Sequence, residues 1–352
     1  MNIRKRNRNI SAVNKRVFVG LSGGVDSAVS AALLKQEGYD VIGVFIKVWT
    51  PDFLPCSWRE ERRDAMRVAL ALDIPFLFLD FSEEYKRGVA DYMIEEYKVG
   101  RTPNPDVLCN REIKFGAFWR EAQKRGADFI ATGHYLSGEK DQSYFLWTLT
   151  QEDYAHTLFP VGHMEKSEVR KLAKKFNLPV AEKKDSQGIC FIGDVSLEDF
   201  LSHFIETKPG KVLDTKGKVI GKHNGALYYT IGERHGFEVI EKGADAGAFY
   251  VVAKDMKANT ITVSSNMKEI ESHAPKRVKI KNVNWLKEPE GPDLLARIRY
   301  RGKKVSVELK LEKKNLIVEF KEPEVGLSLG QSIVFYNDET LLGGAILDKI
   351  LN

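Results

Sequence analysis

The feature that most constrains the fold of this chain is a regular alternation of short apolar runs and helical stretches between residues 16 and about 200. Runs rich in Val, Ile and Phe are typical of β-strands, and they are "RVFVGLS", "YDVIGVFIKVW", "PFLFLDF" and "ADFIATG". Apolar residues recur at helical spacing in the intervening "DSAVSAALLKQEG", "WREERRDAMRVALAL" and "EEYKRGVADYMIEEY". This alternation predicts a doubly wound α/β domain, in which helices cover both faces of a parallel sheet. Such sheets bind ligands beyond the carboxyl ends of their strands.

The pattern changes after the helical stretch "SLEDFLSHFIETKPG". Residues 206–272 are rich in Gly and carry short strand signals, which predicts a small, mostly β central domain. From residue 273 to the end only strand signals remain, separated by Gly, Pro, Asn and Asp turns, which predicts an antiparallel β-barrel. We therefore expect a basic tail at 1–15, a catalytic domain at 16–205, a central domain at 206–272 and a barrel at 273–352.

Composition excludes several classes of protein. Apolar residues make up 43% of the chain and charged residues 29%, as in ordinary globular proteins, and no apolar run is long enough for a membrane span or a secretory signal. Three cysteines are too few for a disulfide framework, so we expect a reducing, cytoplasmic location.

The net charge of +5 is concentrated at the start of the chain, where "MNIRKRNRNISAVNKR" holds six basic and no acidic residues. Either this tail is a solvated leader, or it is an arm that adds salt-dependent affinity for nucleic acid.

The first chemical motif is "FVGLSGGVDSAVSAALL" at residues 18–34, an apolar strand that leads directly into a helix. Glycines let the backbone turn sharply and approach a phosphate, while Ser22 and Ser27 offer hydroxyls beside the amides of the helix N-terminus. No Lys follows, so the motif is not a Walker loop. The full S-G-G-V-D-S string resembles the PP-loop of ATP pyrophosphatases, which split ATP between its α and β phosphates.

Two further motifs each carry a cysteine. In "GRTPNPDVLCNREIKFG", residues 100–116, two prolines stiffen a loop that holds Asp106 and Cys109 before a helical stretch. In "KKDSQGICFIGD", residues 183–194, two lysines precede Cys190, and nearby cations favour the thiolate form of a cysteine. Taken separately, each cysteine is equally consistent with a buried structural residue.

Taken together and in this order, the motifs resemble those of the tRNA-specific 2-thiouridylases, which add sulfur to C2 of the wobble uridine of certain tRNAs. The resemblance runs from about residue 15 to the C-terminus and includes "ATGHY", "KDQSYFL", "YYTIGER", "RIRYRG" and "LGQSIVFY". The resemblance implies ATP and Mg²⁺ as cofactors. It implies two kinds of partner, tRNAs for Lys, Glu or Gln and a persulfide-bearing sulfur-donor protein. It also implies that the enzyme acts as a monomer. The central domain would then bind tRNA.

The resemblance also assigns roles to residues. Cys190 carries the persulfide, Cys109 attacks the Cys190 sulfur to leave a Cys109–Cys190 disulfide, and Asp106 acts as acid or base at the target base. The implied nucleotide contacts are Gly20, Leu21, Ser22, Gly23, Gly24, Val25, Asp26, Ser27, Ile46 and Gly133. The implied tRNA contacts are Asn104, Pro105, Asp106, His134, Lys140, Asp141, Gln142, Arg299, Tyr300 and Gln331.

Several of these residues also have a purely structural interpretation. Taken alone, His134 is more typical of a core histidine and residues 140–142 of a polar turn, whereas Arg299 is equally consistent with ordinary barrel surface. Cys56 has no comparable partner and is interpreted as a structural or incidental thiol. The chain also departs from the family pattern: Ser137 stands where an Arg is usual, and Glu233 and His235 replace a usual Gln and Lys.

Three alternatives to the thiouridylase remain open. Another PP-loop enzyme, such as a GMP-synthetase-like or lysidine-forming ligase, would not need the two cysteines. A non-catalytic tRNA-binding protein would bind tRNA without consuming ATP. Finally, Asp106, Cys109 and Cys190 could supply three ligands of an iron–sulfur cluster.

Overall fold

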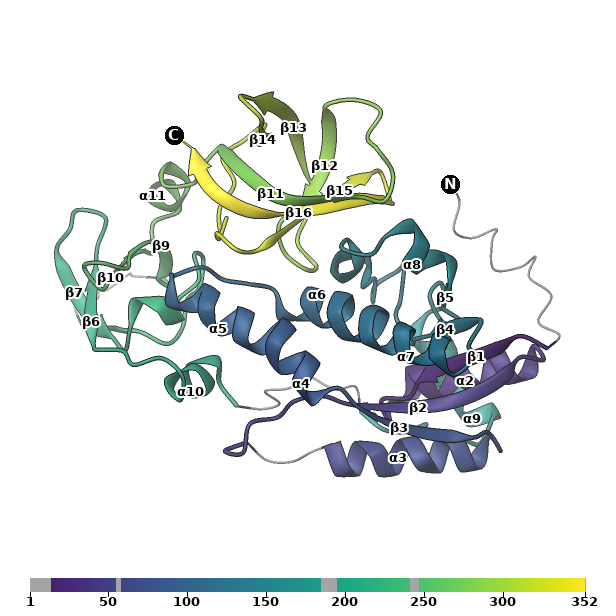
Figure 1. The fold of residues 1–352 in the computed structure, drawn as a ribbon. Helices are drawn as coiled ribbons and strands as arrows, with labels where there is room; N and C mark the ends of the chain where they lie inside the picture. The colour runs from purple at the N-terminus through teal and green to yellow at the C-terminus, as the bar shows by residue number, and fades with distance from the viewer. Residues whose placement is uncertain (1–13, 55–57, 185–194, 241–246, 352) are drawn as a thin grey trace. The chain divides into compact units, whose positions relative to one another are not determined.

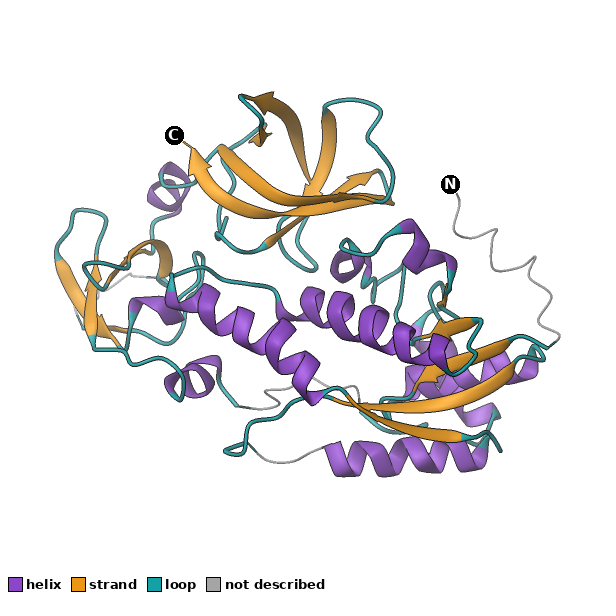
Figure 2. Ribbon diagram, in the orientation of Figure 1, coloured by secondary structure: helices purple, strands orange, loops and turns teal. Residues whose placement is uncertain are grey.

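The structure is a computed structural model that describes residues 14–54, 58–184, 195–240 and 247–351 (Figures 1 and 2). The chain forms two compact units, one from residues 1–89 and 106–194 and the other from residues 90–105 and 195–352. Most of the basic tail, Cys56 and Cys190 lie outside the described residues, so the predictions for them stay predictions. No helix in the described part of the chain is long and apolar enough to cross a membrane.

The first unit is built on a five-stranded parallel sheet in the order β3-β2-β1-β4-β5. This confirms the predicted parallel sheet. The four predicted strands are present, and a short fifth strand that the sequence did not suggest pairs at the edge beside β4. The strands are β1 (Arg16–Gly20), β2 (Asp40–Lys47), β3 (Phe76–Asp80), β4 (Phe129–Ala131) and β5 (Thr157–Leu158).

Helices cover both faces of this sheet, as the alternation predicted. Val17 and Val19 of β1 point into a core shared with α2, α3 and α9, while Gly20, on the opposite face, lies against Phe118 of α7. The helices of this unit are α2 (Val25–Gln36), α3 (Trp58–Ala71), α4 (Ser82–Tyr85), α6 (Pro105–Cys109), α7 (Phe118–Lys124), α8 (Gln151–Ala155) and α9 (Lys166–Lys175), with a 3₁₀ turn at Ser143–Leu146.

Two helical runs contain π-helical segments. Lys86–Ala90 joins α4 to α5 (Asp91–Lys98), and Asn110–Ala117 joins α6 to α7. The second run differs from the sequence prediction, because the stretch around Asp106 and Cys109 is helical from Pro105 onward rather than a loop. The reason is local: Asn104 is restricted to extended backbone by the following proline, and proline is favoured in the first turn of a helix.

The second unit contains the predicted mostly β central region, a five-stranded sheet in the order β8-β7-β6-β10-β9. Its strands are antiparallel except for the β6–β10 pair. The elements are α10 (Leu197–Ser202), β6 (Gly210–Leu213), β7 (Val219–His223), a 3₁₀ turn at Ala226–Tyr228, β8 (Glu238–Val239), β9 (Tyr250–Asp255), β10 (Thr260–Ser264) and α11 (Met267–Ser272).

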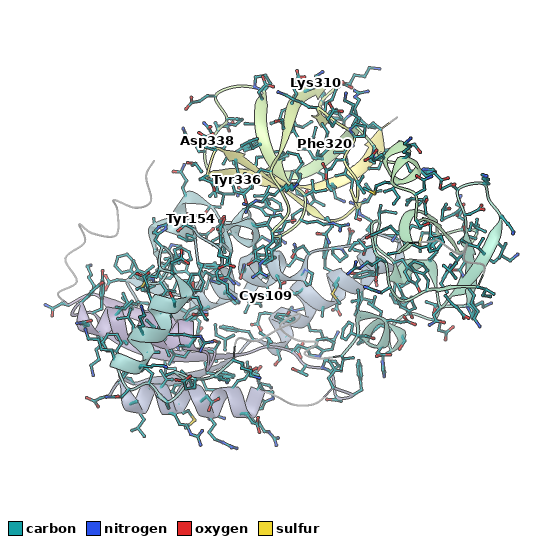
Figure 3. The ribbon with its side chains drawn as sticks, turned by 180° about the vertical axis from the view of Figure 1, so that it is seen from behind. Cys109, Tyr154, Lys310, Phe320, Tyr336 and Asp338 are labelled. Carbon is teal, nitrogen blue, oxygen red and sulfur yellow. The ribbon has the colours of Figure 1, made fainter. Side chains whose placement is uncertain are left out.

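The last part of the chain forms the predicted antiparallel barrel, which closes in the order β11-β14-β13-β12-β15-β16. Val318, Phe320 and Phe335 fill its interior, and Figure 3 labels Phe320 and Tyr336 among its strands. Closure leaves no unpaired edge. The strands are β11 (Arg277–Trp285), β12 (Asp293–Arg297), β13 (Val305–Glu312), β14 (Asn315–Phe320), β15 (Ser332–Asn337) and β16 (Thr340–Leu351).

Candidate active site

The S-G-G-V-D-S string folds into a tight turn between the carboxyl end of β1 and the N-terminus of α2. Gly23 adopts φ +74°, and a Cβ there would lie 2.5 Å from the Glu61 carbonyl oxygen of α3, so only glycine fits. Gly24 is the N-cap of α2 and has no side chain to cap it. The Ser22 and Ser27 hydroxyls lie 3.2 Å apart and tie the two ends of the turn together. The turn therefore presents small residues and helix amides at the edge where such sheets bind phosphates.

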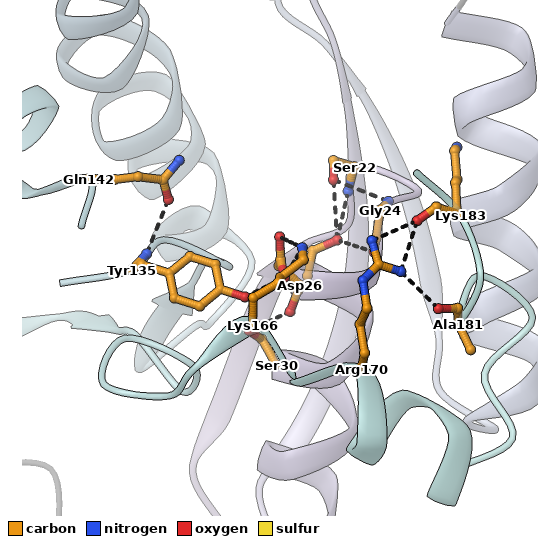
Figure 4. A network of polar contacts seen from close by, with 11 residues as sticks. Ser22, Gly24, Asp26, Ser30, Tyr135, Gln142, Lys166, Arg170, Ala181 and Lys183 are labelled. Carbon is orange, nitrogen blue, oxygen red and sulfur yellow. Dashed lines mark hydrogen bonds and ion pairs between the residues drawn. The ribbon is translucent and has the colours of Figure 1, made fainter. Parts of the chain in front are cut away.

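A lysine of another helix, α9, forms an ion pair with an aspartate of this turn. Lys166, the first residue of α9, donates to both carboxylate oxygens of Asp26 at 2.8 Å, and the Tyr135 hydroxyl donates to Asp26 Oδ1 at 2.6 Å (Figure 4). The lysine and aspartate side chains are only 16% and 30% exposed. Asp26 thus holds an ammonium group beside the turn that carries the S-G-G-V-D-S string.

A second layer of contacts joins α9, α3 and the stretch that leads towards Cys190. Arg170 of α9 donates to the carbonyl oxygens of Ala181 and Lys183 at 3.1–3.2 Å, as Figure 4 shows. The Lys183 ammonium pairs with Asp64 of α3 at 2.8 Å. The chain is therefore anchored directly before residue 185, on the same two helices that border the turn.

Gly133 and His134 follow β4 at the same edge of the sheet. A Cβ on Gly133 would lie 2.8 Å from the Ser27 amide nitrogen, so glycine is required for close packing on the start of α2. His134 is 9% exposed, its Nδ1 lies 2.9 Å from the Thr132 hydroxyl, and its ring packs near Phe115. Burial, together with the charge of Lys114, holds the pKa of His134 well below its usual range. These contacts fit the interpretation of His134 as a core histidine. The contact of His134 with tRNA stays a prediction.

Asp106 and Cys109 lie three residues apart in the first helical turns after Pro105, so their side chains share one helix face. Cys109 is 2% exposed and is labelled in Figure 3. The next residue, Asn110, is also buried and donates to the Phe145 carbonyl oxygen at 3.1 Å. The helix therefore presents an acid and a thiol on one face, although the pairing of Cys109 with Cys190 lies outside the described residues.

The predicted tRNA contacts at residues 140–142 form a polar turn. Gln142 accepts from the Tyr135 backbone amide at 3.1 Å, and Asp141 accepts from the Ser143 amide at 2.9 Å. Ser137, which stands where the family pattern has Arg, bonds to His163 Nδ1 at 3.1 Å. This turn is joined through Tyr135 to the carboxylate of Asp26.

The remaining predicted tRNA contacts lie in the second unit. Arg299 donates to the carbonyl oxygens of Ile231 and Gly326, although its side chain is exposed. Tyr300 lies beneath the Arg301 guanidinium, 5.2 Å from the ring centroid. Gln331 directly precedes β15, and its carbonyl oxygen accepts from the Leu347 amide at 2.9 Å.

Glu233, which departs from the family pattern, also lies in the second unit. Glu233 accepts from the Thr230 amide at 2.9 Å, and burial raises the pKa of this carboxyl group. Burial also lowers the pKa of Lys254 to about 8, and this lysine donates to the Tyr229 carbonyl oxygen at 2.8 Å. Glu233, which stands where the family pattern has Gln, therefore lies in a half-buried polar cluster.

Two other features of the described residues bear on where a site could lie. A hollow of about 250 Å³ on the barrel is lined by Tyr336 and Asp338 among others, and none of the predicted site residues lies in it (Figure 3). Within the described residues, no group of three or more His, Cys, Asp or Glu side chains could hold a metal ion. Since Cys190 is not among them, the predicted iron–sulfur cluster stays a prediction.

Sequence reasoning missed Lys166 and Arg170, and it considered Lys183 only as a cation near Cys190, not as the partner of Asp64. One signal was available: a lysine at the first position of a helix opposes the helix dipole, so a basic residue there needs another partner. The identity of that partner, 140 positions earlier in the chain, was not visible in any local pattern.

Three family models together match nearly the whole chain. They are described as the tRNA methyl transferase HUP domain at residues 15–194, the tRNA methyl transferase PRC-barrel domain at residues 198–265, and the aminomethyltransferase beta-barrel domain at residues 275–347.

Curated relatives match over the same length. The chain is 42% identical to the tRNA-specific 2-thiouridylase MnmA of Staphylococcus epidermidis over 358 aligned positions, which cover 95% of each chain. It is also 42% identical to the enzyme of the same name from Listeria monocytogenes over 356 positions, again 95% of each chain. A solved structure, the U34-tRNA thiolase NcsA from Methanococcus maripaludis, aligns with 57% of this chain and 68% of its own length, at 20% identity and a TM-score of 0.38. On the whole-length identity, this chain belongs to the tRNA-specific 2-thiouridylase family.

Proposed function

We propose that this protein is a tRNA 2-thiouridylase that uses ATP to replace the C2 oxygen of the wobble uridine by sulfur. One observation carries the proposal: a chain 42% identical to curated 2-thiouridylases over 95% of its length folds the S-G-G-V-D-S string into a glycine turn at the carboxyl edge of its sheet. The closely packed Gly23 and the uncapped helix at Gly24 suit the polyphosphate of ATP.

ATP would be held by the turn from Gly20 to Ser27, with Ile46 on the adenine side and Gly133 close by. Mg²⁺ bound with the nucleotide beside this turn would offset the negative charge that develops on the departing pyrophosphate. Lys166 is held by Asp26 beside this turn, so its ammonium group is available to the same negative charge.

The chemistry begins with an unreactive carbonyl. The uridine C2 oxygen attacks the α phosphorus of ATP, pyrophosphate leaves, and the oxygen becomes part of a good leaving group. The terminal sulfur of a persulfide on Cys190 then bonds to C2, and AMP departs with the former carbonyl oxygen. The Cys109 thiolate attacks the inner sulfur of Cys190, so that the outer sulfur stays on the base and a Cys109–Cys190 disulfide forms. A two-electron thiol reductant returns both cysteines to thiols.

Asp106 is the acid or base at the target uridine, and Asn104 and Pro105 lie against the extruded base. The helix face shared by Asp106 and Cys109 supports this assignment, because one rigid element then carries both the proton-transfer group and the resolving thiol. His134, Lys140, Asp141, Gln142, Arg299, Tyr300 and Gln331 complete the proposed tRNA contacts.

The substrates are tRNAs for Lys, Glu or Gln, the sulfur comes from a persulfide-bearing donor protein, and the enzyme acts as a cytoplasmic monomer. A reducing compartment suits a catalyst that must have its disulfide reduced after each turnover.

The test incubates the protein with ATP, Mg²⁺, a persulfide donor and unmodified tRNA transcripts under anaerobic, reducing conditions. Thiolated tRNA is then resolved on a mercury-containing gel, and the nucleoside is identified by mass spectrometry. We expect 2-thiouridine with the wild type, none with Cys190→Ser or Cys109→Ser, and normal amounts with Cys56→Ser as the matched cysteine control.

Each of the other outcomes would support an alternative function or cofactor. Activity retained without Cys109 and Cys190 would favour another adenylating PP-loop enzyme. Methylated uridine formed from a methyl donor would follow the family models' description instead, and tRNA binding without ATP consumption would indicate a non-catalytic protein. Iron and sulfide in the anaerobically purified protein would support the cluster.

A further inference from the structure

Arg101, directly before the "TPNP" stretch, forms a buried fork that joins α5 to the barrel. Its Nε donates to Glu96 Oε2 at 2.7 Å, and its two terminal nitrogens donate to the carbonyl oxygens of Leu347 and Asp348 in β16 at 3.0 and 3.1 Å. The Arg101 and Glu96 side chains are only 16% and 15% exposed. All of these residues belong to the second unit, so the fork fixes this stretch of chain to the barrel.

Thr102 continues the attachment. Its backbone amide donates to the Leu329 carbonyl oxygen at 2.7 Å, its hydroxyl lies 3.2 Å from that of Thr230, and the residue is 6% exposed. At Gly330, which has φ +93°, a Cβ would lie 3.0 Å from the Thr102 carbonyl oxygen and 3.1 Å from Arg101 Cβ. The barrel loop before Gln331 therefore passes so close to this stretch that only glycine fits there.

The attachment passes to the next residues through stiff backbone. Pro103 and Pro105 have fixed φ angles, and each proline restricts the residue before it to extended conformations. Asn104, between the two prolines, thus has little freedom once Arg101 and Thr102 are held. A displacement at Arg101 would move Asn104 and Pro105 with it.

We propose that Arg101 is a positioning residue for tRNA thiolation: it clamps residues 101–105 to β16 and thereby fixes Asn104 and Pro105 where the target uridine must lie. The second half of this proposal rests on the proposed function, which assigns these two residues to the extruded base. The barrel then has a second task besides contacting tRNA, because its strand β16 supplies two of the carbonyl oxygens that hold the stretch.

Lysine cannot replace this arginine. The guanidinium group sends planar donors in three directions, to one carboxylate and two carbonyl oxygens, whereas an ammonium group on a flexible stem acts as a point charge. Arg101→Lys keeps the charge but loses the fork, so it separates positioning from electrostatic attraction. Arg277→Ala is the matched control, since Arg277 also pairs with carboxylates, Glu312 at 2.6 Å and Glu319 at 3.7 Å, but both of these lie on barrel strands rather than in residues 101–105.

The experiment uses the full-length protein and two readouts. Hydrogen–deuterium exchange is followed in peptides that cover residues 96–108 and 326–333. Thiolation is measured as kcat and KM for tRNA, and tRNA affinity is measured separately. We expect faster exchange in both peptides and a kcat lowered about 10–100-fold in Arg101→Lys and Arg101→Ala, with tRNA affinity within about threefold, because a reacting group misplaced by about 1 Å costs rate rather than binding. Arg277→Ala should leave both the exchange rate of the peptide 96–108 and the kcat of thiolation unchanged.

Other results overturn the proposal. Unchanged exchange would mean that Arg101 does not hold the stretch. Faster exchange with a normal kcat would mean that fixing the stretch is irrelevant to the reaction, and lost tRNA affinity with a normal kcat would make Arg101 a binding residue. If the wild type itself forms no 2-thiouridine, the proposed function is wrong, and the exchange data alone then decide whether Arg101 is a clamp.

Discussion

At the scale of single residues, the least expected feature is the lysine that reaches Asp26 from the start of α9. Lys166→Met removes the ammonium group that lies beside the turn from Gly20 to Ser27, to which we assign ATP, and leaves Asp26 with one partner fewer. We expect the rate of pyrophosphate release from ATP to fall about 100-fold, as for other losses of a donor that stabilises developing charge. A radiolabelled pyrophosphate assay with saturating tRNA measures it.

The control is Lys171→Met, an exposed lysine on the same helix. If the two variants release pyrophosphate at the same rate, the contact between Lys166 and Asp26 has only a structural task.

A buried histidine gives the pH dependence of stability. Burial lowers the pKa of His134, so the folded chain binds this proton less readily than the unfolded chain. Its stabilising contribution is therefore complete above the ordinary histidine pKa of about 6.5 and is lost as the pH falls towards the depressed folded pKa. His134→Gln, which cannot titrate, should show a smaller drop in thermal midpoint between about pH 7.5 and about pH 5.5 than the wild type.

His273→Gln provides the comparison, because His273 is exposed at the end of α11. A drop in the His134 variant as large as that of the wild type would contradict the assignment of a buried, neutral imidazole.

At the scale of elements, the glycine turn between β1 and α2 depends on its contact with α3. Gly23 and Gly38 both have left-handed backbone, at φ +74° and +90°, but an added Cβ meets the Glu61 carbonyl oxygen only at Gly23 and nothing within 4 Å at Gly38. Gly38→Ala should therefore cost only the conformational penalty of about 1 kcal/mol. Gly23→Ala should lower the free energy of unfolding by about 2–3 kcal/mol and also weaken ATP binding.

Urea unfolding and nucleotide titration of the two variants test this pair. Equal costs would show that the turn does not need its close approach to α3.

At the scale of the whole molecule, the chain order and the compact units do not coincide. Residues 90–105, which carry α5, belong with the C-terminal half of the chain although they interrupt the first unit. Tyr97 of α5 is 5% exposed, and Gly100 leaves no space for a Cβ against Met256. Residues 90–105 thus contribute one helix, α5, to the second unit, although they come from the N-terminal half of the sequence.

Two matched substitutions test that division. Tyr97→Ala should destabilise the second unit by about 3–5 kcal/mol, whereas Phe118→Ala, a buried residue of α7, should destabilise the first by a similar amount. Hydrogen exchange in β1 and in β16 reports on the two units separately. A Tyr97 variant that speeds exchange in β1 and leaves β16 unchanged would contradict the assignment of α5.

Much of the fold was predictable from the sequence, because strand and helix periodicity are local. The runs around Val17, Val41 and Phe78 gave the parallel strands, and the strand signals after residue 273 gave the barrel. The short β5 was not predictable, since two residues carry no periodicity and pair only because β4 offers an edge. The helical start at Pro105 was not predictable from the residue types, because proline is common both in rigid loops and in the first turn of a helix.

The sequence by itself determined the glycine turn between β1 and α2, since glycine, serine and the following helix act within a few residues of one another. It also supplied the order of the two cysteine motifs, and with them the family resemblance. Only the tertiary structure decided which groups meet the turn and the "TPNP" stretch. The contacts of Lys166 with Asp26 and of Arg101 with Leu347 join residues 140 and 246 positions apart. Such contacts depend on how helices and strands pack, and no local pattern of residue types encodes them.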